Sequence, residues 1–352
     1  AELYIKTGNT YRPASDNTGN VTVNDFEIPS GGIFTADGNT ITITGDATPF
    51  VVAGTLNEDT STFKYSSAST TTITPETYYH LSLQPSAAGG PTYTLGNATF
   101  NTRNLVVGDG TNAVTINWTA NDPVINVGGN LTLNASATWT KSNSASLTFN
   151  GATTPVTLTD NNTTKQDLGK LIIDGAKEVD IGSSITAESM NVTTGDTLDL
   201  QSSSYTLKIT GSGLTTSRPF IVAGTLTEGT STVEYTGTSA TDIDDEIYYN
   251  LNLNQSGTTF TGFGNIGVSN VFTINAGTFN AGSNTVTLSG SSTPFVVTGT
   301  FTEGTSTINY TGTSATNITS DTYHNLQVGY VALGSSVTVS YTHLRAHETG
   351  RN

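Results

Sequence analysis

Four carboxylate side chains stand within five residues, at Asp242, Asp244, Asp245 and Glu246. Hard cations such as calcium take several oxygen ligands, and carboxylates grouped in a turn can supply them. The cluster therefore predicts a weak calcium site, and calcium is the only cofactor that the sequence suggests. The corresponding positions of the other repeat copies lack this ligand set, which favours a solvated charged turn as the alternative.

Tyrosines recur at matching positions of the repeat and form a second set of candidate residues. These are Tyr78, Tyr79, Tyr248, Tyr249 and Tyr323. An aromatic ring can bind the apolar face of a sugar while the phenol hydroxyl stays hydrated, so an exposed row of them would contact glycans. The alternative is an aromatic ladder stacked inside the fold, and the recurrence favours it.

Catalytic signatures are absent from the sequence. His80 and His324 align with Asn or Tyr in other copies, which indicates a structural role. Outside residues 339–352, no serine stands in a nucleophile elbow, no glycine-rich phosphate loop follows a strand, and no histidine pair has zinc-ligand spacing. We therefore predict that the chain is not an enzyme.

The elements that would position these residues belong to an internal repeat. Closely similar segments begin near Pro49, Pro219 and Pro294, and a degraded copy begins near Pro123. Pro219 and Pro294 are 75 residues apart. Self-similarity at a fixed period is the signature of an array of stacked structural units. We expect such an array over residues 31–338, after an irregular N-terminal segment at residues 1–30.

Apolar and polar residues alternate within each unit, as in Thr62-Phe63-Lys64-Tyr65, which is typical of strands with one buried face. The inward residues are evenly spaced. Phe63 and Leu81 are 18 residues apart, as are Val233 and Leu251. Coils of this length that repeat with Gly, Asn and Asp turns predict an all-β, parallel β-solenoid whose turns stack. Tandem immunoglobulin-like β-sandwiches are the alternative, because several short strands also fit each unit.

Composition agrees with many short strands over a thin core. Hydrophobic residues make up 34% of the chain and charged residues only 11%, whereas disordered chains are usually highly charged. The net charge of −16 argues against nucleic acid as a partner, because phosphate binding needs Lys and Arg. The chain has no cysteine, which fits an exported protein, and no apolar run long enough to span a bilayer.

The run GTSTVEYTGTSATDIDDEIYYNLNLNQSG, followed by VFTINAGTFNAGSNTVTLSG, resembles repeats of bacterial surface adhesins and autotransporter passengers. The resemblance covers roughly residues 31–330 and rests on pattern and composition. It implies a right-handed β-helix at the cell surface, acting as a stalk or as an adhesive surface. The partner would be a glycan or a protein. An alternative is a polysaccharide lyase or hydrolase on the same fold, or its accessory binding region, but the scattered basic residues argue against it.

The last fourteen residues differ from the rest. Residues 339–352 resemble the conceptual translation of a sequencing adaptor, and they hold two of the four histidines, His343 and His347. We therefore expect them to be non-native and the native chain to continue beyond residue 338, with the last repeat unit truncated. A solenoid cut there would expose an open coil, so we also expect end-to-end self-association.

Overall fold

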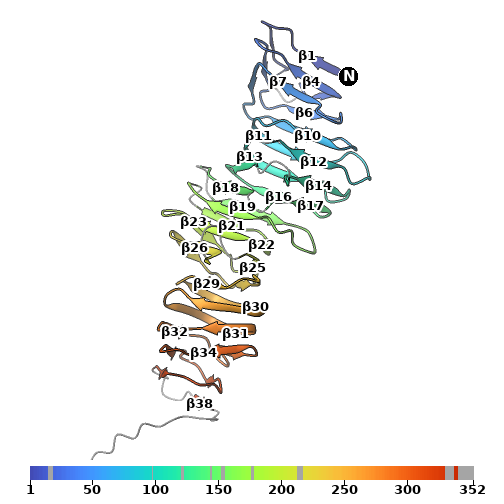
Figure 1. Cartoon of the computed structure of the whole chain (residues 1–352). Coiled ribbons are helices and arrows are strands. Elements are labelled where there is room, and N and C mark those ends of the chain that lie inside the picture. Colours follow the sequence, from blue (N-terminus) through green and yellow to red (C-terminus); the bar gives the residue numbers. More distant parts are fainter. Residues whose placement is uncertain are drawn as a thin grey trace, which may run out of the picture. The chain divides into compact units, whose positions relative to one another are not determined.

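The computed structural model describes residues 1–14, 19–96, 98–119, 123–142, 145–151, 155–175, 178–211, 217–329 and 337–339. Its regular elements in these ranges are all strands, and parallel strands stack as a β-solenoid of about 14 turns (Figure 1). The chain divides into two compact units. The first contains Ala1–Asp199 with Ala223–Thr225, and the second contains Leu200–Val222 with the chain from Leu226 onward.

Short strands make up both units. The strands up to Asp199 are β1 (Glu2–Tyr4), β2 (Thr10–Tyr11), β3 (Val21–Val23), β4 (Asp25–Ile28), β5 (Ile33–Thr35), β6 (Thr40–Ile43), β7 (Phe50–Val52), β8 (Thr55–Asn57), β9 (Thr62–Tyr65), β10 (Thr71–Ile73), β11 (Thr77–Leu83), β12 (Thr92–Leu95), β13 (Thr99–Val107), β14 (Val114–Asn117), β15 (Val124–Val127), β16 (Leu131–Leu133), β17 (Ala137–Thr140), β18 (Ser146–Phe149), β19 (Val156–Asp160), β20 (Lys170–Ile173), β21 (Glu178–Ile181), β22 (Ile185–Ala187), β23 (Ser189–Val192) and β24 (Thr197–Asp199). The strands after Asp199 are β25 (Thr206–Ile209), β26 (Phe220–Val222), β27 (Thr225–Thr227), β28 (Thr232–Tyr235), β29 (Thr241–Ile243), β30 (Ile247–Gly262), β31 (Ile266–Asn280), β32 (Thr285–Leu288), β33 (Phe295–Val297), β34 (Thr300–Thr302), β35 (Thr307–Tyr310), β36 (Thr316–Ile318), β37 (Asn325–Val328) and β38 (Val337–Val339).

The register between coils confirms the spacing found in the sequence. Phe63 of β9 lies directly beside Leu81 of β11, and Val233 of β28 lies beside Leu251 of β30. Each of these ladders is parallel, whereas the strands of an immunoglobulin-like sandwich are antiparallel. The solenoid prediction is therefore confirmed and the sandwich alternative is wrong.

The core of each unit consists of the inward row of every strand. Phe63, Leu81, Val233 and Leu251 are all buried, as the alternation predicts. Aromatic rings from successive strands stack in the first unit, where the centroid of Phe50 lies 5.4 Å from that of Phe63. Because each strand buries only one face and its backbone bonds to neighbouring coils, the small apolar fraction suffices.

The first thirty residues differ from the irregular segment that the sequence suggested. Strands β1, β3 and β4 pair in parallel with the following strands, and Phe26 lies directly beside Phe50. Phe26 is buried in the same aromatic stack. Their sequence lacks the repeat motif, but their backbone joins the same ladder, because the ladder requires alternation and not residue identity.

A tight turn follows strands β8, β27 and β34. In the first of these turns the amide of Ser61 donates to the carbonyl of Glu58 at 3.0 Å, and Asp59 has φ 46°. Gly229 and Gly304 hold the matching position with φ 54° and 56°. Only this left-handed conformation closes the turn, which explains why Asp and Gly alternate there.

The end of the described chain is strand β38, which pairs in parallel with β36. Residues 340–352, and with them nearly all of the segment that resembles an adaptor, lie outside the described residues. Leu326 of β37 lies beside Ile308 but is only half-buried.

Candidate functional site

The acidic cluster at Asp242–Glu246 is divided between the inside and the outside of the second unit. Asp244 is 1% exposed, and one of its carboxylate oxygens forms an ion pair with the guanidinium of Arg218. The other oxygen accepts the backbone N–H of Val222 at 2.8 Å. This carboxylate is satisfied inside the protein and is not directed at a solvent-borne cation.

Comparison of the repeat copies shows why Arg218 and Asp244 occur together. Arg218 stands where the first copy has Thr48, and Asp244 stands where it has Thr74. The hydroxyl of Thr74 donates to the carbonyl of Phe50. One copy thus carries an ion pair at two positions where the first copy carries threonines. The exchange concerns the structure of the repeat and not a binding site.

The other carboxylates of the cluster point elsewhere. Asp242 accepts a hydrogen bond from the hydroxyl of Ser217, and the exposed Asp245 lies 4.0 Å from Arg218. Among the described residues, the cluster contributes no three carboxylates whose oxygen atoms converge. The structure therefore gives the predicted calcium site no support, because Asp244 is directed inward to Arg218 whereas Asp245 is exposed.

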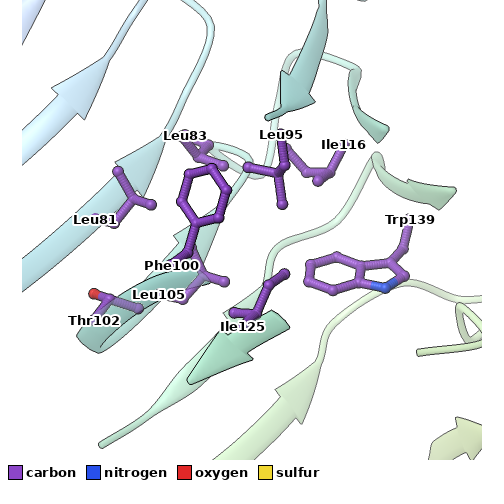
Figure 2. Close-up of a pocket in the computed structure, with 9 residues that line it drawn as sticks. All are labelled: Leu81, Leu83, Leu95, Phe100, Thr102, Leu105, Ile116, Ile125 and Trp139. Atoms are coloured by element: carbon purple, nitrogen blue, oxygen red, sulfur yellow. The ribbon is translucent and has the colours of Figure 1, made fainter. Parts of the chain in front are cut away.

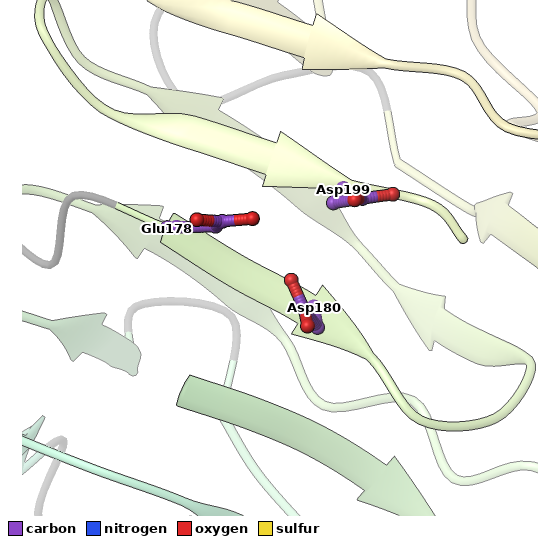
Figure 3. A group of neighbouring side chains, drawn as sticks. All are labelled: Glu178, Asp180 and Asp199. Carbon is purple, nitrogen blue, oxygen red and sulfur yellow. The ribbon is translucent and has the colours of Figure 1, made fainter. Parts of the chain in front are cut away.

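Three carboxylates do converge in the first unit, at Glu178, Asp180 and Asp199 (Figure 3). Their oxygen atoms lie within 4.8 Å of one another, and each residue is half-buried. Asp180 of β21 lies directly beside Asp199 of β24 in the parallel register. The sequence analysis missed this group, because alternation places Glu178 and Asp180 on one face but the match to Asp199 depends on the coil length.

Two of the five candidate tyrosines are core residues. Tyr78 and Tyr248 are buried, so they cannot contact a glycan, and the internal-ladder interpretation is the right one for them. The hydroxyl of Tyr78 lies 3.2 Å from that of Tyr65 and donates to the carbonyl of Thr74 at 2.7 Å. Tyr323 is half-buried and repeats this arrangement with Tyr310, at 3.3 Å.

Burial governs the acidity of these phenols. It raises the pKa of Tyr65 to about 12, while the hydrogen bond between the hydroxyls of Tyr65 and Tyr78 partly opposes the effect. The pKa of Tyr78 rises well above its ordinary value, first through burial and then through the neighbouring Tyr65. Both phenols are therefore neutral at physiological pH and serve as hydrogen-bonding core residues.

Tyr79 and Tyr249 are the remaining candidates, and both are half-exposed. Tyr79 stands between two polar side chains. The guanidinium carbon of Arg103 lies 5.4 Å from its ring centroid, and the ring of His80 packs edge-on against it at 4.6 Å. The aromatic row predicted from sequence is thus reduced, in the first unit, to a single ring that an arginine and a histidine hold in place.

A groove of about 400 Å³ opens beside Tyr79. Its lining residues are Glu58, Thr77, Tyr78, Tyr79, Asn101, Thr102, Arg103, Asn126, Gly128, Asn150 and Gly151. They come from five successive coils, which the ladders β9–β11, β11–β13, β13–β15 and β15–β18 join. At about 4.8 Å per ladder step, the groove spans about 19 Å along the stack of coils.

Glycines form one part of this groove. Gly128 and Gly151 follow Arg103 on the next two coils, and a Cβ placed on Gly151 would collide with the backbone of Gly128. On the neighbouring column the amide of Asn126 donates to the side-chain oxygen of Asn101 at 2.8 Å. The groove therefore has an aromatic and cationic wall, a floor without side chains, and a border of amides.

A second hollow of about 280 Å³ continues along the same strands and includes His80, Asn104 and Asn130. The amide of Asn104 lies 2.8 Å from Nδ1 of His80. Burial lowers the pKa of His80, and the positive charge of Arg103 lowers it further. The imidazole is therefore neutral at physiological pH, and Nδ1 can accept the amide hydrogen.

The first unit also encloses a small apolar cavity, which Figure 2 shows with Phe100, Ile125 and Trp139 pointing into it. Its volume is about 10 Å³, so it can hold no ligand larger than a water molecule, and its apolar lining offers a water few partners. It is a packing defect of the core and not a binding site.

The chain matches no known family model, no curated protein and no solved structure. The resemblance to adhesin repeats therefore stays a resemblance of pattern. No helix in the part of the chain that the structure describes could cross a membrane.

Proposed function

We propose that this chain is a non-catalytic, extracellular repeat segment that serves as a surface stalk or an adhesive surface. The observation that carries the proposal is the outward face of the coils. Rows of hydroxyl and amide side chains cover buried rows, and asparagines of successive coils hydrogen-bond to one another, as Asn270 does to Asn250 at 2.8 Å. Such a face is hydrated, rich in uncharged polar groups and repetitive, which suits contact with polymers outside the cell.

The fold supports this role for a second reason. In a solenoid each coil contacts mainly its neighbours, so coils can be added without rebuilding a central core. The absence of cysteine and the low content of charged residues agree with an exported repeat protein. The groove beside Tyr79 supplies a place where such a surface could hold a ligand.

Polysaccharide hydrolysis is the second candidate, because two carboxylates lie near that groove. Burial raises the pKa of Glu76, and the charge of Glu58 raises it further, as a general acid requires. The same pairing recurs at Asp321, whose pKa is raised by burial and by Glu303. Because the same pair of neighbouring carboxylates occurs in two copies of the repeat, it belongs to the turn of the repeat. This favours the non-catalytic role.

The decisive experiment incubates the purified chain with polysaccharide-coated beads and measures both retained protein and released sugar. We expect retention on at least one polysaccharide, with no release of reducing ends. Release that the substitutions Glu58→Gln or Glu76→Gln abolish would overturn the proposal in favour of a hydrolase.

A further inference from the structure

We propose that the groove beside Tyr79 binds a carboxylated glycan, with Arg103 contacting the carboxylate and Tyr79 contacting a sugar ring. This inference deepens the adhesive role proposed above and rests on it. It names one site on the repeat surface and one chemical class of ligand.

The first argument is the state of Arg103. The structure describes three arginines, and two of them pair with carboxylates, Arg12 with Asp37 and Arg218 with Asp244. Among the described residues no carboxylate lies within ion-pair distance of Arg103, which instead stacks on Tyr79. Within the described part of the chain, the guanidinium of Arg103 therefore has no internal counter-charge, and a ligand carboxylate would supply one.

The second argument is the shape of the groove. Tyr79 and Arg103 form a wall one coil apart, and Gly128 and Gly151 leave the next two coils without side chains. Glu58 precedes Tyr79 by one coil and Arg103 by two, or about 10 Å along the stack, so it faces the far end of the groove. A ligand with its carboxylate at Arg103 therefore keeps its charge away from Glu58.

The third argument is the chemistry of the border. Amides of Asn101, Asn126 and Asn150 line the groove and can both donate to and accept from sugar hydroxyls. The tyrosine ring offers an apolar face, and its packing against His80 and Arg103 fixes its orientation before a ligand arrives. Aromatic, amide and guanidinium groups together fit an acidic sugar better than a peptide or a lipid surface.

The repeat provides an internal control. Tyr249 is the counterpart of Tyr79 in the second unit and is also half-exposed. The next strand carries Ser269 and Asn270 in the matching bend, so no arginine is available there. The site is thus predicted for one copy of the repeat and not for the other.

The test is calorimetric titration of the full chain with oligogalacturonate, a polymer of uronic acid rings, and with its methyl ester as the uncharged probe. We expect binding of the acid, and binding of the ester weaker by about tenfold or more, since a charge-assisted hydrogen bond contributes about that factor. Arg103→Gln and Tyr79→Ala should each weaken binding of the acid at least about tenfold, whereas Lys170→Gln and Tyr249→Ala should leave it unchanged.

A third variant fills the groove. A Cβ placed on Gly128 would have no neighbour closer than 3.6 Å, and this glycine has no left-handed φ, so Gly128→Gln should fold normally and abolish binding. Failure of the acid to bind, equal binding of acid and ester, or full affinity of Arg103→Gln would each overturn the inference. Reducing ends released from the same probe would instead count against the non-catalytic role, so the two failures are distinguishable.

Discussion

The ion pair between Arg218 and Asp244 provides the sharpest test of how this repeat is built. Other copies carry threonine at both positions, as at Thr48 and Thr74. Asp244 is 1% exposed and Arg218 is 20% exposed at the side chain. The substitution Arg218→Thr would leave a buried carboxylate with only the N–H of Val222 as an identified donor, so it should destabilise the second unit.

The expected loss is about 3 kcal/mol, the lower end of the range for breaking a buried ion pair. Asp244→Thr should cost less, about 1–2 kcal/mol, because Arg218 is partly exposed and its guanidinium carbon lies 3.7 Å from the ring centroid of Phe263. The double variant recreates the threonine pair of the other copies. It should lie within about 1 kcal/mol of the original protein, because replacing a complete buried pair is often nearly neutral.

Native-state hydrogen exchange of amides in β26 and β29 measures these losses locally, which suits a repeat array that does not unfold as one unit. The pair of Arg12, which is 61% exposed, and Asp37 is the control, and Arg12→Thr should destabilise the first unit far less than Arg218→Thr destabilises the second. A double variant that loses the sum of the two single losses, about 4–5 kcal/mol, would refute the reasoning, since additivity would show that the two sites are not coupled.

Three further outcomes follow from the core and from the acidic group. Phenols of an unfolded chain ionise above pH 10, whereas the buried Tyr65, whose pKa is raised to about 12, stays protonated, so the stability of the fold falls as pH rises from 10 to 12. In alkaline unfolding curves Tyr65 alone should account for about 3 kcal/mol of this loss, and Tyr65→Phe should remove that part. Phe63→Ala should cost about 3–5 kcal/mol in denaturant unfolding of the first unit, whereas Lys64→Ala on the outward row should change stability by less than about 0.5 kcal/mol. Asp199→Asn should stabilise the first unit by about 0.5 kcal/mol, because it removes a like charge directly opposite Asp180. Thermal unfolding in the presence of a chelator should therefore show a higher midpoint, and a lowered midpoint would contradict this.

The solenoid could be predicted because its two requirements are written locally in the sequence. Alternation selects the inward residues of each strand, and the constant step from Phe63 to Leu81 and from Val233 to Leu251 sets the coil length. Apolar residues at that step lie beside one another in parallel register. The first thirty residues follow the same alternation without the repeat motif, so residue identity alone does not reveal their strands.

The candidate sites could be predicted only in part. Tyr78 and Tyr79 are neighbours in sequence, yet Tyr78 is buried and Tyr79 is half-exposed, because successive residues of a strand point to opposite faces. Asp244 was grouped with three other carboxylates, although its partner is Arg218, 26 residues earlier. Adjacency in sequence therefore did not indicate which side chains share a surface.

What the sequence determined by itself is the repeating coil, because alternation and turn residues act over a few positions. Only the tertiary structure decided which side chains meet across coils, as Asp180 meets Asp199 and as Arg103 meets Tyr79. Such meetings depend on the number of residues in each intervening coil, which varies from 18 between Phe63 and Leu81 to 27 between Leu131 and Leu158. A change of one residue in that number turns a side chain to the opposite face of its strand, so contacts between coils follow from the summed length of strands, bends and turns and not from any local pattern.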